Sequence, residues 1–302
     1  MARQLRIAAP RFETRAERGH PDAPEILLRE TAALLDSLRP DSPDLVVLSE
    51  GVGAVGMTVE TAEEIDNPGP FIDLYRRSAR QLQSCLVGTL KLREDDDVYN
   101  AALFVAPDGE VLGAYRKSYL TRGELDAGLT PGPGARVTDT PAGRIGAMIC
   151  FDLNFRPLRD AYADLAPDLL VFPSMFHGGI LQRQWAVECR CHLVSAMQVE
   201  GGGIIDPFAR PLARTHCYTD VALATINLDY RLAHLDHNRE ALQSLQREFR
   251  PHVTVDVPPN IGRAMIVNHT EEHDLDELIE QYDIELLEDY LESCRRANEA
   301  RR

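Results

Sequence analysis

A chain of 302 residues can bury one large core, and no Gly/Ser-rich or Pro-rich linker divides this one, so we expect one main domain with a C-terminal extension. The formal net charge of −16, without a basic cluster, argues against nucleic acid and anionic membranes as partners, because both carry negative charge. No run reaches the roughly 18 apolar residues of a membrane-spanning helix, and the first residues lack the apolar stretch of a signal peptide. We therefore expect a cytoplasmic protein that acts on a small molecule.

Strand-like runs and helical patterns alternate along the chain. The expected strands are 5–9, 45–49, 85–90, 101–106, 110–115, 144–149, 168–173, 192–198, 203–206 and 220–228. The expected helices are 24–38, 70–83, 156–165, 180–191 and 230–248, with a further separate helix over 274–290. This alternation indicates an α/β layered fold. Because several strands are apolar on both faces, they need cover on each side, which either a doubly wound sheet or two packed sheets between helices would give.

Three of the apolar runs each end in one chemically active side chain. Residues 44–50 end in the carboxylate of Glu50, residues 112–117 end in the ammonium group of Lys117, and residues 144–150 end in the thiol of Cys150. A buried carboxylate and a buried ammonium group are each costly alone, but the two can offset one another in a shared pocket. The pattern predicts a nucleophile, a base and a cation at neighbouring strand ends.

These residues give the chain a resemblance to the nitrilase superfamily, the carbon-nitrogen hydrolases with a Glu-Lys-Cys triad. The motifs are Leu48-Ser-Glu50, Tyr115-Arg-Lys-Ser-Tyr-Leu120 and Met148-Ile-Cys-Phe-Asp152, in the family's order and spacing. Further similarity, at 98–110, 123–132 and 205–212, extends the resemblance from about residue 4 to about residue 230. It implies a four-layer α-β-β-α sandwich that dimerises through its helices. We accordingly expect a hydrolase core over residues 1–235 and a C-terminal helical extension over 236–302, which packs on the core or on a partner subunit.

The resemblance also implies a role for each member of the triad. Cys150 would attack a carbonyl carbon, and Glu50 would take the thiol proton, return it to the leaving amine and later activate water. Lys117, with the backbone N–H of Phe151, would stabilise the oxyanion. A thioester on Cys150 would then be hydrolysed, with no cofactor and no metal required.

Three further observations refine this hypothesis. Glu124 matches a family position thought to hold the Lys or the substrate, although Asp126 lies in the same loop. His177 follows a strand end on the expected rim of the site, where it is a candidate substrate contact or an ordinary surface histidine. The sequence Cys150-Phe-Asp resembles the amidase and carbamoylase branches more than the nitrilase branch, which tends to have Cys-Trp-Glu.

The six cysteines lie far apart, except for Cys189 and Cys191, and this spacing suits reduced thiols without a structural disulfide. The segment from Cys189 to His192 offers metal-ligand types, but a fourth ligand at suitable spacing is missing, so we expect no metal site.

The function predicted from the sequence is cysteine-dependent hydrolysis of a small amide or N-carbamoyl compound by a homodimer or larger homo-oligomer. Three alternatives remain: a nitrilase that uses the same triad, an acyltransferase that passes the thioester to an amine or alcohol, and a non-catalytic binding protein on the same fold.

Overall fold

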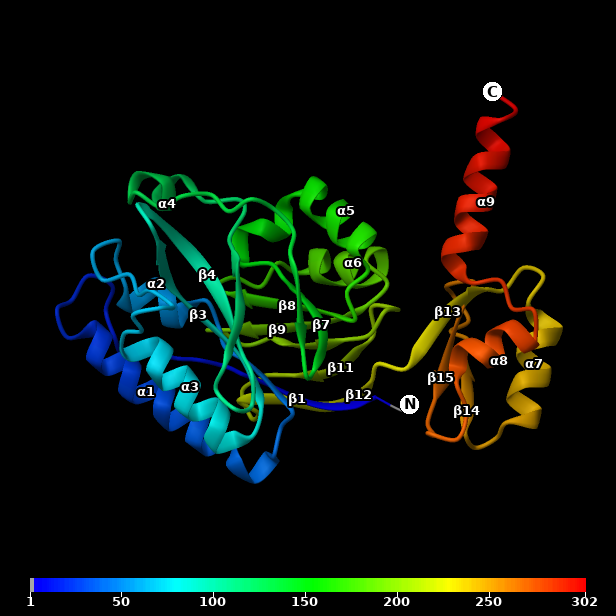
Figure 1. The fold of residues 1–302 in the computed structure, drawn as a ribbon, viewed down its shortest axis with the longest axis horizontal. Coiled ribbons are helices and arrows are strands. Elements are labelled where there is room, and N and C mark those ends of the chain that lie inside the picture. The colour runs from blue at the N-terminus through cyan, green and yellow to red at the C-terminus, as the bar shows by residue number, and fades with distance from the viewer. Residues whose placement is uncertain (1–2) are drawn as a thin grey trace. The chain divides into compact units, whose positions relative to one another are not determined.

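A computed structural model describes residues 3–302, and the chain forms two compact units. The core unit comprises residues 6–225, and the C-terminal unit comprises residues 226–302 together with residues 3–5. Figure 1 shows the elements of both units. Each unit has its own hydrophobic core, so we describe them separately.

Two six-stranded sheets form the centre of the core unit. The first has the order β12-β1-β2-β3-β4-β5, with strands Val221–Asn227, Gln4–Pro10, Leu45–Val47, Cys85–Glu94, Asp97–Val105 and Val111–Arg116. The second has the order β11-β10-β9-β8-β7-β6, with strands Pro211–Arg214, Gly203–Ile205, His192–Met197, Leu169–Ser174, Gly143–Ala147 and Val137–Thr140. In each sheet three neighbouring strands are parallel: β1, β2 and β3 in the first, and β7, β8 and β9 in the second.

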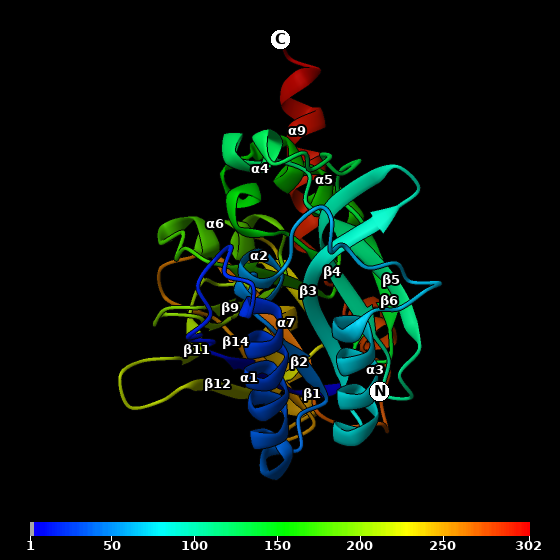
Figure 2. The same cartoon turned by 90° about the vertical axis from the view of Figure 1, so that its left-hand side faces the viewer.

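Helices cover the outer faces of both sheets, which gives the expected four layers. Helices α1 (Ala23–Ser37) and α3 (Pro70–Leu82) lie side by side on the first sheet, as both views show (Figures 1 and 2). Helix α1 presents Leu27, Thr31 and Leu35 inward at a helical spacing, so one face of the helix is buried. Helices α5 (Arg156–Leu165) and α6 (Ile180–Glu188) lie beside the second sheet (Figure 1). The Ser49 hydroxyl donates a hydrogen bond to the Ser174 carbonyl (3.1 Å), which links the two sheets near the strand ends.

The C-terminal unit is a small α/β structure. Its sheet has the antiparallel order β13-β15-β14, formed by Tyr230–His234, Arg263–Asn268 and Val253–Asp256. Helices α7 (Arg239–Glu248), α8 (Leu275–Gln281) and α9 (Leu287–Glu299) complete it. Leu245, Val253, Ala264 and Ile266 are fully buried at its centre.

The C-terminal unit differs from the predicted helical extension in three respects. The helix expected over 230–248 begins only at residue 239, because 230–234 pair with β15 and their backbone groups are used in that ladder. The helix expected over 274–290 is two helices, since Asp283 adopts a left-handed backbone (φ 51°) that ends the first. Strands β14 and β15 also fall within 236–302, which we expected to be a helical extension. They form because β15 pairs with both β13 and β14, and segments that lie apart along the chain supply this pairing.

Candidate active site

Three strand ends of the core unit deliver Glu50, Lys117 and Cys150 to one cavity of about 500 Å³. Glu50 follows β2 and precedes the short helix α2 (Gly51–Gly56), and Lys117 follows β5 directly. Cys150 begins η2 (Cys150–Asn154), a single turn that follows β7. The remaining lining residues come mainly from three loops and two helices: Arg18, Gly19, Ala54, Val55, Met57, Thr58, Val59, Glu60, Lys91, Thr121, Gly123, Glu124, Ala127, Leu129 and Met175.

Lys117 is fully buried between two carboxylates. Its Nζ donates hydrogen bonds to Glu50 Oε1 (2.9 Å) and to Glu124 Oε1 (2.9 Å) and Oε2 (3.0 Å), and its side chain is 1% exposed. Burial by itself disfavours the charged form, but the negative charges of Glu50 and Glu124 outweigh this effect and raise the pKa of Lys117. The lysine therefore keeps its positive charge throughout the neutral range.

The two oxygens of Glu50 have different surroundings. Oε1 accepts hydrogen bonds from Lys117 Nζ and from Asn100 Nδ2 (3.0 Å). Oε2 is buried and accepts no hydrogen bond from any residue in the described range 3–302. A buried carboxylate oxygen without a donor is energetically unfavourable and is available to accept a proton.

Glu124 is held rigidly at the first turn of helix α4 (Arg122–Asp126). Thr121 caps this helix, and Glu124 Oε2 accepts hydrogen bonds from the Thr121 N–H (2.9 Å) and hydroxyl (3.0 Å). Asn100 Nδ2 donates to Glu124 Oε1 (2.8 Å) as well as to Glu50. Burial raises the pKa of Glu124, but Lys117 and these donors lower it to about 2 overall. Of the two loop acids considered, the structure places Glu124, and not the exposed Asp126, against Lys117.

Cys150 adopts a left-handed backbone (φ 48°), a conformation that is strained for a residue with a side chain. Burial raises the pKa of its thiol, the negative charge of Glu50 raises it further, and Lys117 lowers it, so that it stands at about 11. Lys117 by itself favours the thiolate, but its effect is smaller than those of burial and Glu50. Cys150 is a thiol at neutral pH, and its reaction needs a base.

A buried carboxylate, Asp152, fixes the turn that carries Cys150. Its Oδ2 accepts hydrogen bonds from the Ile149 N–H (2.9 Å) and the Tyr115 hydroxyl (2.8 Å), and its Oδ1 accepts one from the Tyr119 N–H (2.7 Å). Complete burial raises the pKa of Asp152 to about 7. Because Tyr115 and Tyr119 flank Lys117 in sequence, this carboxylate ties the nucleophile turn to the segment that carries the lysine.

Phe151 and His177 contribute no side chain to the part of the cavity wall that residues 3–302 form. The ring of Phe151 packs edge-on against Phe155, with centroids 5.3 Å apart, while its backbone N–H lies in the first turn of η2. His177 is exposed, and its Nδ1 accepts a hydrogen bond from the Gly179 N–H (3.0 Å).

Two residues near the triad were not identified from the sequence, namely Asn100 and Lys91. Asn100 lies on β4 and bridges the carboxylates of Glu50 and Glu124, and Lys91 lies on β3 and lines the cavity. Each is a polar side chain inside an otherwise apolar strand segment, and this is the signal that could have found them.

Within residues 3–302, no group of three or more His, Cys, Asp and Glu side chains has a geometry that could hold a metal ion. No helix in the described part of the chain is long and apolar enough to cross a membrane.

Comparison with known proteins places the chain among carbon-nitrogen hydrolases. The sequence model of the carbon-nitrogen hydrolase family matches residues 31–232. Deaminated glutathione amidase of Homo sapiens is 29% identical over 194 residues, which cover 54% of this chain and 59% of that protein. Omega-amidase NIT2-A of Xenopus laevis is 28% identical over 197 residues, covering 57% of this chain and 71% of the relative.

Solved structures share the fold. Nit3 of Saccharomyces cerevisiae, a member of branch 10 of the nitrilase superfamily, superposes with a TM-score of 0.64 at 19% identity. The superposition covers 82% of this chain and 95% of that one.

Proposed function

The chain belongs to the carbon-nitrogen hydrolase family, and from this premise we propose that it hydrolyses a C–N bond of a small amide or N-carbamoyl compound through a thioester on Cys150. The observation that carries the proposal is the convergence of three groups on one cavity: the Cys150 thiol, the unpaired Oε2 of Glu50 and the charged Lys117. Both named relatives are amidases, which favours an amide over a nitrile as the substrate.

In the first half of the reaction, Glu50 Oε2 takes the proton from Cys150 Sγ as the sulfur attacks the carbonyl carbon. The carbonyl oxygen gains negative charge, which Lys117 and the Phe151 N–H stabilise. The first N–H groups of a helix have no partner within the helix, so the Phe151 N–H is suited to this role. The C–N bond then breaks, and the leaving nitrogen takes the proton from Glu50 and departs as ammonia or an amine.

In the second half, water replaces the leaving group. Glu50 takes a proton from this water as its oxygen attacks the thioester carbonyl, and the C–S bond breaks. The acid product leaves, and the thiol regains its proton.

Glu50 is required because the thiol is rarely ionised by itself. With a thiol pKa of about 11, about one molecule in ten thousand carries a thiolate at pH 7. Transfer of the proton to a base already in place removes the need for this rare species. Lys117 cannot serve as that base, since its raised pKa keeps it protonated.

The test is intact-protein mass and ammonia release during incubation with primary amides, N-carbamoyl compounds and nitriles. We expect an acyl adduct and ammonia with the unmodified chain, neither with Cys150→Ala, and a strongly reduced rate with Glu50→Gln. Cys217→Ala is the control, because Cys217 is exposed and outside the cavity, and it should behave as the parent. Hydrolysis that persists in Cys150→Ala, or ammonia from nitriles alone, would contradict the proposal.

We also propose that the protein works in the cytoplasm as a homo-oligomer. All six cysteines carry free thiols, which supports a reducing compartment. Light scattering of the purified chain would give the oligomer mass, and a monomer would exclude this part of the proposal.

A further inference from the structure

Lys91 is a buried cation that makes no direct contact with a carboxylate of the described residues, although the charges of Glu50 and Glu124 act on it from farther away. Its side chain is part of the cavity wall, and the residue is 6% exposed. Within residues 3–302, its ammonium group makes no hydrogen bond or ion pair, whereas its backbone N–H contacts Met57 Sδ (3.4 Å). A buried ammonium group costs free energy unless it is paired, so its position in the fully buried part of β3 favours a partner from outside the chain.

Three acids line the cavity together with Lys91, and none of them contacts its ammonium group directly. Glu50 Oε1 and both oxygens of Glu124 contact Lys117, and Asn100 contributes to the same two carboxylates. Glu60 also lines the cavity, but it is exposed. In the described part of the chain, Lys91 therefore forms no ion pair with Glu50, Glu124 or Glu60.

A second cation, Arg18, lines the same cavity and adds to this positive region. Its guanidinium contacts Met175 Sδ (3.8 Å), a neutral group. Burial lowers the pKa of Lys91 to about 8; Glu50 and Glu124 oppose this shift, while Lys117 and Arg18 add to it. An anion between Lys91 and Arg18 would relieve the repulsion between these two cations.

We propose that Lys91, assisted by Arg18, binds a carboxylate group of the substrate and so selects amides or carbamoyl compounds that carry a carboxylate away from the scissile bond. This inference rests on the proposed function of the site and names the class of substrate. A charged hydrogen bond to a carboxylate is the kind of contact whose loss weakens binding about 10- to 100-fold. Above pH 8, Lys91 loses its proton, so the KM for such substrates should rise there while that for neutral amides should not.

The experiment compares alkylation of Cys150 by iodoacetate and by iodoacetamide, which have nearly the same shape but differ by one negative charge. Lys91→Met keeps most of the buried stem and removes the charge. We expect the ratio of the iodoacetate rate to the iodoacetamide rate to fall about tenfold or more, with the iodoacetamide rate unchanged. Lys91→Arg should retain most of the preference for the anion. Peptide mapping shows that Cys150 is the site modified, and circular dichroism shows that the variant is folded.

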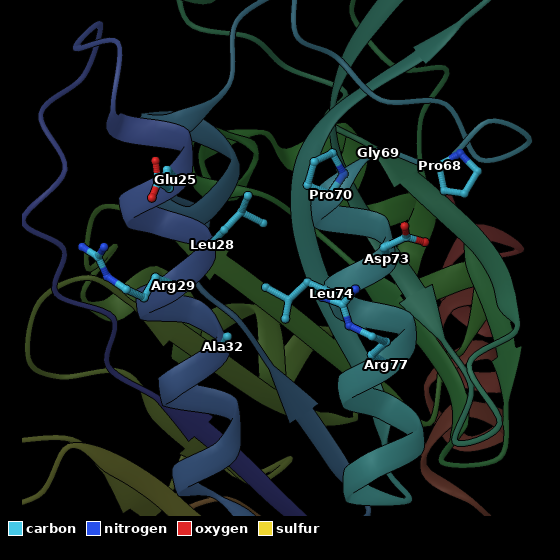
Figure 3. A pocket seen from close by; sticks show the side chains of 10 residues that line it. All are labelled: Glu25, Leu28, Arg29, Ala32, Pro68, Gly69, Pro70, Asp73, Leu74 and Arg77. Carbon is cyan, nitrogen blue, oxygen red and sulfur yellow. The ribbon is translucent and has the colours of Figure 1, made fainter.

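A matched control removes one positive charge elsewhere. Arg77 lies on α3 in a separate cavity between α1 and α3, about 590 Å³ in volume, which Figure 3 shows in close-up. Arg77→Met changes the net charge as Lys91→Met does, so it should leave the ratio unchanged. If the ratio of the iodoacetate rate to the iodoacetamide rate fell equally in both variants, the ratio would depend only on the overall electrostatic field of the protein. That result would overturn the proposal.

Two other outcomes would also overturn it. If the iodoacetate and iodoacetamide rates change by a similar factor in Lys91→Met, Lys91 acts by altering Glu50 and Cys150. If neither rate changes, Lys91 does not contact the anion. Hydrolysis is measured separately, with succinamate and its neutral isostere butyramide. Selective alkylation without hydrolysis of any amide would contradict the proposed function and leave anion binding by Lys91 intact.

Discussion

At the scale of single residues, the two oxygens of Glu50 have different surroundings. Oε1 is bound by Lys117 and Asn100, which fixes the plane of the carboxylate, and Oε2 is buried without a donor from residues 3–302. The charge on Glu50 raises the thiol pKa, and in the proposed mechanism its unpaired oxygen is the base for the thiol. We therefore expect Glu50 to suppress the free thiolate and to promote the reaction that needs proton transfer.

Glu50→Gln separates these two effects. Removal of the negative charge lowers the pKa of Cys150, so iodoacetamide, which needs only the thiolate, should react faster with the variant at pH 8. Amide hydrolysis should fall by about 10²- to 10⁴-fold, because the base is lost. Alkylation and hydrolysis measured on the same preparation would check both directions. A parallel fall in the two rates would show that Glu50 holds the site together without acting as a base.

We propose that Glu124 sets the upper pH limit of the hydrolysis of neutral amides, whose binding does not involve Lys91, through Lys117. Glu124→Gln removes one of the two carboxylates that raise the lysine pKa, so Lys117 should lose its proton at a lower pH. With a neutral amide, the alkaline limb of kcat/KM should move toward neutral pH, with about a 10-fold loss at the optimum because the lysine is less well held. Asp126→Asn on the same helix is the control, since Asp126 is exposed and outside the cavity. An unshifted alkaline limb in Glu124→Gln would exclude this role.

At the scale of elements, the site residues lie on short segments at the strand ends. The strands of the two sheets fix the positions of these segments. Helix α2 follows Glu50 and packs on β3, with Gly53 against the backbone of Leu90. A Cβ atom at Gly53 would lie 2.7 Å from that backbone, a separation that real structures do not show. We therefore expect the position of Glu50 to depend on this close approach of α2 to β3.

Gly53→Ala tests that approach. The added methyl group must push α2 away from the β3 backbone, so we expect a loss of about 1–3 kcal/mol in the free energy of unfolding and a clear loss of hydrolysis. Urea denaturation of the variant gives the first quantity. Gly123→Ala on α4 is the stability control, because its Cβ would meet nothing within 4 Å. If Gly53→Ala and Gly123→Ala unfolded at the same urea concentration, α2 would not pack on the β3 backbone as closely as we infer.

Much of the core unit could be predicted from local sequence. The predictions of the family and of the stacked-sheet fold are confirmed. Continuous apolar runs that end in one charged residue indicate buried parallel strands and their ends, so Glu50 and Cys150 could be placed at an edge without a structure. Lys91 and Asn100 are recognisable as polar side chains within apolar strand segments, but their roles could not be assigned, because their orientation toward a cavity depends on how the strands pack.

The C-terminal unit was less predictable for a related reason. Strands β14 and β15 are short, and the pairing of β15 with β14 on one side and with β13 on the other gives them a stability that local propensity does not show. The break between α8 and α9 depends on one left-handed residue, Asp283, that no glycine marks. Apolar spacing alone predicted one continuous helix there.

At the scale of the whole molecule, the site belongs to one unit. Glu50, Lys117, Glu124 and Cys150 all lie within residues 6–225, and the C-terminal unit has a separate hydrophobic core. Its helices α8 and α9 contribute Leu275, Leu278 and Leu287 to buried positions of that unit. A defect in the C-terminal core should therefore change the stability of that unit without changing the chemistry of Cys150.

Leu245→Ala makes such a defect. Leu245 is fully buried on α7, so the truncation should cost about 2–5 kcal/mol and reduce hydrogen-exchange protection over 230–268. The rate of Cys150 alkylation by iodoacetamide should stay within about twofold of the parent, since no group that sets the thiol pKa lies in this unit. Val46→Ala in β2 is the matched control: Val46 is equally buried but supports the strand that leads to Glu50, and its truncation should reduce protection over 45–105. If Leu245→Ala slowed alkylation as much as Val46→Ala did, residues 226–302 would have to act on the site, and the independence of the two units would be wrong.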